Sequence, residues 1–439
     1  MTLTGRAVLA AALGVVVAGL LGAAGVLLVC SVLAVGVAID LALAGRIRDL
    51  ALSRAGATQT RLGVPVTVSL LVTNDGRRRV RGQLRDAWVP SAGASPRTHR
   101  IDVPAGERRR FETRLVPTRR GDRRTVQLTI RSLGPLGLAG RQRRHTRLVE
   151  GAREQTAPWT VRVLPPFTSR KFLPEKLARL RQLDGAVAIN RRGQGTEFDS
   201  LREYVDGDDV RSIDWRATAR RDTVVVRTWR PERDRRLVCV LDTGRTSAAR
   251  VGDAPRLDAA LDACLLLAAV AARAGDRVDL LAADRRVRGS VEAATRGDVL
   301  PRLVQAMAVL EPSLVETDAS LLVSEVLRRE RKRCLVVLFT ALDGAAVEEG
   351  LLPVLPSLTS RHTVVLAAVG DPRVAELAGR RGDAEAVYQA AAAERALGER
   401  RRLIATLRRR GVEIVDAPPE IFASAVADTY LALKAAGRL

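Results

Sequence analysis

The stretch "LVCVLDTGRTS" (residues 237–247) decides which fold the C-terminal half of the chain adopts. An uninterrupted apolar run ends at Asp242, and a short polar loop follows it. Continuous apolar strands are typical of parallel sheets covered on both faces, and ligands of such sheets bind at the carboxyl ends of the strands. Any chemistry in this half is therefore expected at and just after Asp242.

The alternation of apolar strands with helical segments continues to the end of the chain and predicts an α/β domain over residues 237–439. The predicted strands are 237–242, 277–283, 334–340, 363–369 and 412–416. The predicted helices are 255–274, 296–310, 318–331, 383–410 and 419–436.

A dense alternation of acids, arginines and apolar residues precedes this domain, in "EFDSLREYVDGDDVRSIDWRATARR" (197–221). Phe198, Leu201 and Tyr204 recur at helical spacing and predict a short amphipathic helix, which the following "DGDD" breaks. Val210, Ile213 and Trp215 are interpreted as apolar anchors, and "DTVVVRTW" (222–229) as a strand.

Three interpretations of these charges compete. Paired carboxylates can perform acid–base chemistry, but no nucleophile, histidine or phosphate-binding loop accompanies them. "DGDD" lacks the regularly alternating ligands of a calcium loop. A network of arginines and carboxylates that fixes loops or binds a partner is favoured. Its predicted members are Glu197, Phe198, Leu201, Arg202, Tyr204, Gly207, Asp208, Ile213, Asp214, Trp215, Ala219, Arg220 and Arg227.

From Ala7 to Gly45 the N-terminal segment is largely apolar, and its only charged residue is Asp40, near the end of the run. A spanning helix needs about 20 apolar residues, so the run predicts two short spans, 7–22 and 25–44. Arginines flank both ends, which by the positive-inside rule places the rest of the chain in the cytosol. A signal peptide is the alternative, and the second apolar run argues against it.

Residues 55–165 contain short alternating strands of the kind found in an immunoglobulin-like β-sandwich. "VPVTVSLLVTN" (64–74) leads into "NDG", a hairpin-type turn signal. Further strands are predicted in 109–117 and 123–134, with turns at 119–121 and 134–138. No catalytic constellation occurs in this region, so a spacer or docking domain is expected.

The overall composition narrows the possible functions. The 439-residue chain has a formal charge of +23, carried almost entirely by arginine, and only 3% aromatic residues. No aromatic interleaving or RNA-binding motif supports nucleic-acid recognition. The histidines are far apart, which argues against a zinc site or a catalytic triad. Cys30, Cys239, Cys264 and Cys334 lie in apolar runs and are predicted to be buried, unpaired thiols.

Residues 195–235, with their Glu-Phe-x-x-Leu-Arg-x-Tyr, Ile-Asp-Trp and Val-Arg elements, resemble the signature of the bacterial domain-of-unknown-function family 58. The apolar N-terminus, the "GPLGL" turn and the closing "YLALK" extend this resemblance along the chain. The resemblance implies a cytosolic von Willebrand factor A-like domain at the C-terminus. It also implies a MoxR-type AAA+ ATPase as partner.

The von Willebrand A-like expectation adds a candidate metal site, because such domains bind a divalent cation through an Asp-x-Ser-x-Ser motif and later loops. Asp242 matches the first ligand, and Thr246, Thr317 and Asp343 are further candidates. Gly244 and Ala341 stand where oxygen-bearing side chains are expected. A magnesium ion would therefore bind weakly.

The sequence thus predicts four regions: a membrane hairpin (1–48), a β-sandwich (55–165), a charged joint (166–236) and the α/β domain (237–439). The expected function is a non-enzymatic adaptor anchored in the cytoplasmic membrane. A metal-dependent ligand receptor, an envelope enzyme and a nucleic-acid-binding protein are the alternatives, in that order.

Overall fold

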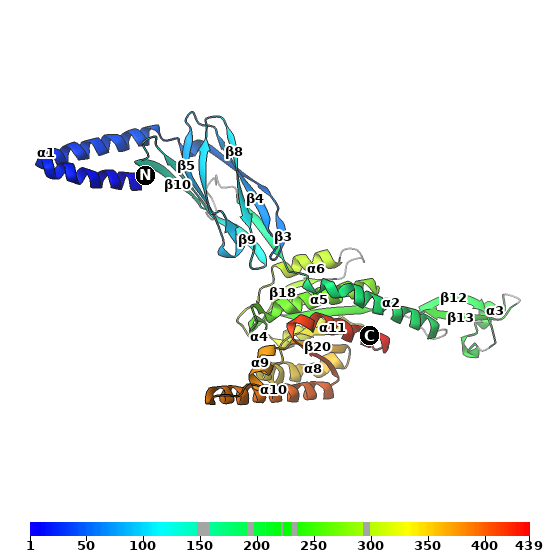
Figure 1. Cartoon of the computed structure of the whole chain (residues 1–439). Helices are drawn as coiled ribbons and strands as arrows, with labels where there is room; N and C mark the ends of the chain where they lie inside the picture. The colour runs from blue at the N-terminus through cyan, green and yellow to red at the C-terminus, as the bar shows by residue number, and fades with distance from the viewer. Residues whose placement is uncertain (147–157, 191–196, 207, 221–222, 231–234, 293–298) are drawn as a thin grey trace. The chain divides into compact units, whose positions relative to one another are not determined.

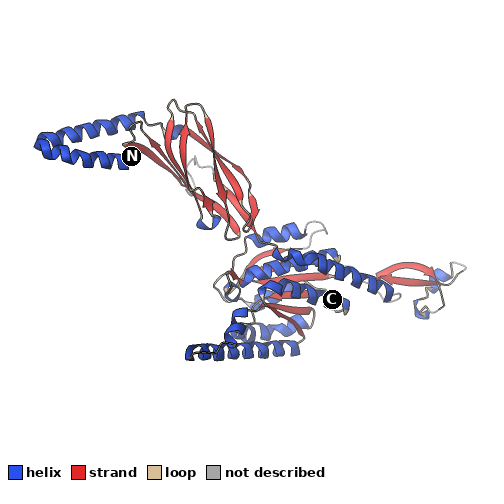
Figure 2. Cartoon of the chain, viewed as in Figure 1, coloured by secondary structure: helices blue, strands red, loops and turns tan. Residues whose placement is uncertain are grey.

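The computed structural model describes residues 1–146, 158–190, 197–206, 208–220, 223–230, 235–292 and 299–439 (Figure 1). The chain forms two compact units, Met1–Leu164 and Pro165–Leu439. The first contains an apolar helical segment and two β-sheets, and the second contains an α/β sheet and two small two-stranded sheets (Figure 2). The protein is therefore multidomain, as predicted.

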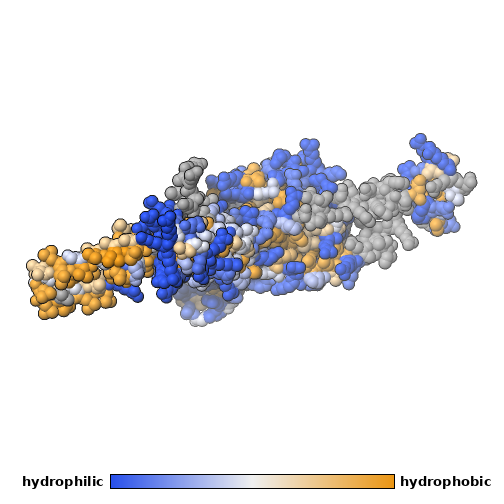
Figure 3. All heavy atoms as spheres, turned by 90° about the horizontal axis from the view of Figure 1, so that it is seen from above, coloured by the Kyte–Doolittle hydropathy of each residue, from blue (hydrophilic) through white to orange (hydrophobic). Residues whose placement is uncertain are grey.

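Helix α1 (Gly5–Leu43) bends sharply at Gly22, whose φ of 61° and ψ of −144° are not helical. The halves before and after the bend lie side by side (Figure 1). They approach closely at Gly14, where an added Cβ would lie 2.3 Å from Cγ1 of Val29. Most of the visible α1 surface is hydrophobic (Figure 3). Within the described residues, Ala18–Asp49 is the segment long and apolar enough to cross a membrane, and Gly5–Val16 is a shorter apolar helix.

Asp40 fastens α1 to the rest of its unit. Its side chain is fully buried and accepts hydrogen bonds from the backbone N–H groups of Leu136, Leu138 and Ala139, at 2.8, 2.5 and 2.9 Å. A Cβ on Gly134 would lie 2.3 Å from Asp40 Oδ1, so this close approach requires glycine. The charge inside the apolar run is therefore bound by the "GPLGL" turn.

Two antiparallel sheets form the rest of the first unit. The larger contains β1 (Thr2–Leu3), β3 (Gln59–Arg61), β5 (Val80–Trp88), β7 (Thr98–Val103), β9 (Gly121–Leu133), β10 (Ala139–Thr146) and β11 (Thr160–Leu164), of which β3 and β11 pair in parallel. The smaller contains β2 (Leu50–Gly56), β4 (Val66–Asn74), β6 (Ala94–Ser95) and β8 (Arg108–Leu115). Short helix η1 (Ile47–Asp49) joins α1 to β2, and η2 (Pro90–Ala92) joins β5 to β6.

The two sheets enclose one core, as in a β-sandwich. Leu70 and Val72 of β4 pack with Leu84 of β5 and Ile130 of β9, and all four are buried. The predicted hairpin at "NDG" is wrong, because β4 pairs with β2 and β8 while β5 pairs with β7 and β9. The chain crosses from one sheet to the other at this point.

A six-stranded sheet organises the second unit, in the order β18-β17-β14-β19-β20-β21. Its strands are β14 (Arg236–Asp242), β17 (Arg277–Ala283), β18 (Val287–Val291), β19 (Leu335–Phe339), β20 (Thr363–Val369) and β21 (Val412–Ala417). Only β18, an edge strand that the sequence prediction missed, pairs antiparallel. The short pair β15 (Arg250–Val251) and β16 (Ala254–Pro255) follows helix α4 (Arg245–Ala248).

Helices cover both faces of this sheet. One face packs on α7 (Ala319–Arg329), α8 (Leu352–Thr359) and α10 (Ala384–Arg409), through residues such as Leu322, Leu355 and Leu407. α5 (Arg256–Arg273), α11 (Pro419–Ala435) and α2 (Leu173–Asn190) pack together, and Phe422 of α11 meets Phe339 of β19 edge-on. The other helices are α6 (Val299–Ala308), η5 (Ala346–Leu351) and α9 (Pro372–Ala378).

The segment after Pro165 packs on the α/β layer. Ser169 of η3 (Thr168–Phe172) donates through its backbone N–H and its hydroxyl to the Asp262 carboxylate of α5, and buried Lys176 of α2 pairs with Asp428 of α11 at 2.9 Å. Cys239, Cys264 and Cys334 are buried as predicted, and burial raises the pKa of Cys334 to about 12. Cys30 on α1 is exposed, contrary to the prediction, because an isolated apolar helix buries few of its side chains.

Candidate functional site

The mid-chain motif folds as a two-stranded antiparallel ribbon of β12 (Glu197–Glu203) and β13 (Val225–Arg230). The predicted helix over 197–205 is therefore wrong. The register shifts between Phe198 and Ser200, and such a bulge interrupts strict in-and-out alternation, so apolar spacing typical of a helix is compatible with a strand. The predicted strand at 222–229 is confirmed from Val225 onward, in β13, and Asp222 lies outside the described residues.

Asp214 organises the loop between the two strands. Its Oδ1 accepts the backbone N–H groups of Arg216 and Ala217 at 3.0 and 2.9 Å, which caps the short helix α3 (Trp215–Thr218). Its Oδ2 accepts Nε of Arg227 in β13 at 2.8 Å. The Ala217 N–H, and then the Arg227 guanidinium, lower the pKa of this carboxyl below its ordinary value.

Asp208 fixes the other end of the loop, also by binding an arginine and a backbone N–H. It accepts Nη2 of Arg202 at 2.5 Å and the backbone N–H of Val205 at 3.0 Å. These partners lower the pKa of Asp208, and the pair raises the pKa of Arg202. Short helix η4 (Val210–Ser212) and a bridge from Ile213 to Val226 complete the loop.

The apolar residues of this loop divide into a buried and an exposed set. Val225 and Val226 of β13 are buried. Trp215 is 67% exposed and Val210 is 60% exposed, so the prediction that both are packed anchors is wrong. Val205, at 61%, adds to this exposed set. The Asp208 and Asp214 contacts hold the backbone here, which leaves these apolar side chains uncovered.

The other motif residues have less defined roles. Leu201 and Tyr204 are half-buried, and the Tyr204 N–H donates to the Val224 carbonyl at 2.8 Å. Ala219 ends α3, and Arg220 after it is exposed. For Glu197 and Phe198 the structure describes only the backbone, in β12, and Gly207 lies outside the described residues.

A second polar cluster lies at the carboxyl end of β14. Asp242 is 3% exposed, and three threonine hydroxyls donate to it: Thr246 of α4 at 3.1 Å, and Thr317 and Thr340 of two later loops at 2.5 and 2.6 Å. The Gly244 N–H donates to Asp242 at 2.8 Å. Both carboxylate oxygens are therefore satisfied by protein donors, as a buried charge requires.

Gly244 explains how Thr317 reaches this carboxylate. A Cβ at residue 244 would lie 2.0 Å from Oγ1 of Thr317 and 3.2 Å from Oδ1 of Asp242. The absent side chain leaves the space that the Thr317 hydroxyl fills. The hydroxyl group expected at residue 244 in a metal-binding loop is thus replaced by one from a different loop.

Asp343 makes no hydrogen bond to the Asp242 cluster among the described residues; its Oδ1 accepts the Ala346 N–H at 3.4 Å. Ala341 is buried. Thr340 was not singled out from the sequence, although its place at the end of a predicted strand beside Asp242 could have identified it. No group of three or more His, Cys, Asp or Glu side chains in the described ranges is arranged to hold a metal ion. The donor set fits a divalent cation only in part, because Asp242 is its one carboxylate.

Similar proteins cover part of the chain. Three uncharacterized proteins, one from Mycobacterium bovis and two from strains of Mycobacterium tuberculosis, are each 27% identical over 187 residues, or 42% of this chain. The matched region spans 58% of the length of these relatives. A solved CARDB domain from Pyrococcus furiosus, in complex with di-metal ions, is 17% identical with a TM-score of 0.19, over 26% of this chain and 87% of that one.

The family model described as "Protein of unknown function DUF58" matches residues 200–398, from the ribbon to α10. This span contains both the Asp214 loop and the Asp242 cluster. The resemblance drawn from residues 195–235 is confirmed: residues 200–398 match the DUF58 family model.

Proposed function

We propose that this protein is a membrane-anchored, cytosol-facing adaptor that uses the Asp214 loop to bind a protein partner. The observation that carries the proposal is Trp215, 67% exposed and immediately after the carboxylate that fixes its loop. Tryptophan is enriched at the energetic centres of protein interfaces. A rigid backbone also lowers the entropic cost of binding.

The composition of the loop supports a protein partner. Val205 and Val210 add apolar surface to Trp215, while Arg211 and Arg216 are exposed beside them. An aromatic and aliphatic centre with charged residues around it is the usual anatomy of a transient interface. The same loop offers no nucleophile–base pair among its described residues, so it gives no support to an enzymatic role.

The anchoring part of the proposal rests on α1. The bend at Gly22 and the packing of Gly14 against Val29 support a hairpin of two spans, and Arg6 and Arg46 at its two ends support cytosolic flanks. Both termini of a hairpin face the same side of a membrane. The sandwich and the α/β unit would then both lie in the cytosol.

The partner class follows from the family resemblance. We assign the C-terminal unit to the von Willebrand A-like type, supported by its sheet order and by the position of Asp242 at the end of the central strand β14. The resemblance then favours a MoxR-type AAA+ ATPase as the partner.

Capture of such an ATPase from the same organism by the detergent-solubilised full chain tests the adaptor function. Replacing Trp215 with alanine should weaken capture by about 30-fold, the effect of removing an interface hot spot. Tyr388→Ala is the matched control, because Tyr388 is a 78% exposed aromatic residue on α10. Equal capture by the wild type and the Trp215 variant would contradict the proposal.

A divalent-metal-dependent ligand receptor is the second candidate. It is favoured by the convergence of Thr246 and Thr317 on Asp242. These three residues would hold the ion, and a bound Mg²⁺ would supply an open coordination position for an anionic ligand. Calorimetric titration of the full chain with Mg²⁺ or Mn²⁺ separates the two functions, because the adaptor needs no metal. Loss of the binding heat in Thr317→Val would assign the ion to this cluster.

A further inference from the structure

We propose that a basic pocket beside the end of α1 binds the phosphate headgroup of an anionic phospholipid. The pocket has a volume of about 890 Å³ and lies between η1, the start of β2 and the loop that follows β4. Its charged lining residues are Arg46, Arg48, Asp49, Asp75, Arg77 and Arg78.

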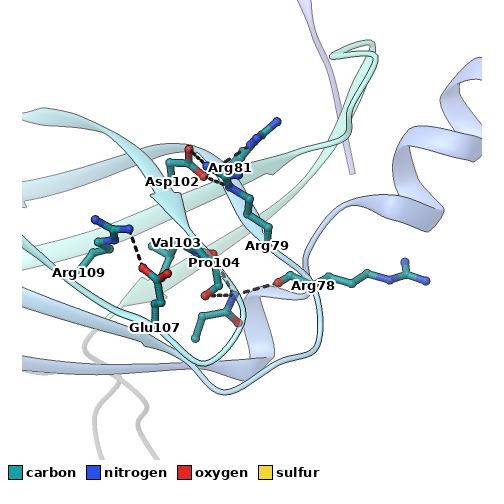
Figure 4. A network of polar contacts seen from close by, with 9 residues as sticks. Arg78, Arg79, Arg81, Asp102, Val103, Pro104, Glu107 and Arg109 are labelled. Carbon is teal, nitrogen blue, oxygen red and sulfur yellow. Dashed lines mark hydrogen bonds and ion pairs between the residues drawn. The ribbon is translucent and has the colours of Figure 1, made fainter.

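The loop that follows β4 is fixed by hydrogen bonds to the Asn74 side chain. Asn74 is fully buried, and its Nδ2 donates to the carbonyls of Arg78, Val103 and Pro104 at 2.9, 3.0 and 3.1 Å (Figure 4). Its Oδ1 accepts the Gly76 N–H at 3.1 Å. The backbone that carries Arg77 and Arg78 is therefore fixed before any ligand arrives.

Half of the positive charge of the pocket is not balanced by its own aspartates. Four arginines against two aspartates leave a net charge of +2 (4 − 2). The side chains of Arg46, Arg48 and Arg77 make no ion pair with a described residue, and all three residues are exposed. Arg79, the next residue of the loop, is instead paired with Asp102 (Figure 4). Guanidinium groups match phosphate oxygens well, because their N–H donors form a planar fork.

The position of the pocket identifies the source of the phosphate. Arg46 and Arg48 lie at the end of the apolar segment Ala18–Asp49, and the Arg78 guanidinium donates to the Ala42 carbonyl in the last turn of α1. With α1 in a bilayer, the pocket lies at the level of the headgroups of the same leaflet. This step rests on the membrane anchoring proposed above. Anionic headgroups attract basic side chains held near the membrane surface.

Lipid binding to the full-length protein in a zwitterionic detergent tests the pocket, with native mass spectrometry as the readout. Phosphatidylglycerol should bind in preference to phosphatidylcholine. The double variant Arg48→Ala/Arg77→Ala should lower the phosphatidylglycerol affinity by about 10- to 30-fold. Arg114→Ala/Arg119→Ala is the matched control, because it removes the same charge from exposed sites near the opposite end of β8.

Each outcome bears on the proposal. No preference between the two lipids, or equal losses in both double variants, overturns it. Equally tight binding of glycerol 3-phosphate would overturn the lipid as the source. Arg48→Lys/Arg77→Lys, which keeps the charge, should retain most of the binding and shows whether the alanine variant merely misfolds.

Membrane fractionation of cells separates a failure of this proposal from a failure of the anchoring. If the wild type is absent from the membrane fraction of cells, the proposed membrane anchoring is wrong. If it is present there but shows no lipid preference, only the pocket fails.

Discussion

Two aspartates, Asp214 and Asp242, organise two loops of the same unit in opposite ways. Asp214 accepts two backbone N–H groups and an arginine, and the apolar residue beside it remains exposed. Asp242 is buried, and the hydroxyls of three threonines, one on α4 and two in later loops, converge on it. One carboxylate shapes a surface, whereas the other ties together the edge of a sheet.

The difference shows that a conspicuous acidic residue identifies a structural centre more readily than a reactive one. No nucleophile–base pair lies beside either carboxylate among the described residues. What differs is the surface each leaves available: an exposed tryptophan at Asp214, and a cluster of satisfied hydroxyls at Asp242. Substitutions in the two loops should affect folding to different extents, and the largest effect is expected at Asp242.

Asp242→Ala should have the largest effect, because it leaves the Gly244 N–H and the threonine hydroxyls without their shared acceptor. The free energy of unfolding of the second unit should fall by about 3 kcal/mol. The rate at which the buried Cys239 thiol reacts with a labelling reagent measures this opening and should rise about a hundredfold. Asp383→Ala, which removes the carboxylate that accepts the Ala386 N–H at the start of α10, should cost only about 1 kcal/mol. Similar labelling of both variants would contradict the assigned role of Asp242.

Gly244→Ser should have the next largest effect on the free energy of unfolding. Its Cβ would fall 2.0 Å from the Thr317 hydroxyl, and forcing the loops apart should cost about 1–3 kcal/mol. The double variant Gly244→Ser/Thr317→Ala removes the clashing oxygen and should recover part of the loss. A double-mutant cycle on Cys239 labelling measures this coupling. Strictly additive effects would show that the two residues do not compete for one space.

Acid should open the Asp214 loop while the α/β core remains closed. The folded-state pKa of Asp214 lies below the unfolded value of about 3.9. Its contribution is therefore complete above that value and is lost as the pH falls through the folded pKa. Hydrogen exchange of the backbone over 208–220, corrected for intrinsic rates, should rise only at pH values below about 4. Arg227→Gln should move this opening to higher pH, and an unchanged midpoint would refute the contribution of Arg227.

Trp215→Ala should have the smallest effect on folding, within about 0.5 kcal/mol, because the ring is mostly exposed. Circular dichroism melting of the full chain and Cys239 labelling should both match the wild type. A destabilisation above 1 kcal/mol would show that the ring packs in solution, and would remove the main support for a binding role.

The sequence predicts the two units unequally well. Strands such as 277–283 and 363–369 match β17 and β20 residue for residue, because fully buried parallel strands are continuous apolar runs. The ribbon was mistaken for a helix because the bulge at Phe198–Ser200 disguises its strand periodicity. The exposure of Trp215 was also missed, because composition does not say which apolar residues remain uncovered.

Contacts between residues far apart in the chain could not be predicted from the sequence. The bonds from Asp40 to Leu136 and Leu138, and from Thr340 to Asp242, each join residues nearly a hundred positions apart. Local periodicity carries no information about such pairs. The candidates Asp242, Thr246 and Thr317 were nevertheless predicted as one cluster, because the resemblance to von Willebrand A-like metal sites groups them, whereas Asp343 from the same expectation does not join them.

The junction at Asp40 has a mechanical consequence. The carboxylate grips the backbone of the β9–β10 turn, and Arg141 also donates to the Leu41 carbonyl at 2.9 Å, so no slack linker separates the apolar helices from the sheets. A helix in a thinner bilayer leans over to keep its hydrocarbon covered. Here the sandwich would have to tilt together with the helices, because the two are joined without a flexible linker. Bilayer thickness would then set the angle between the sheets of the first unit and the membrane surface.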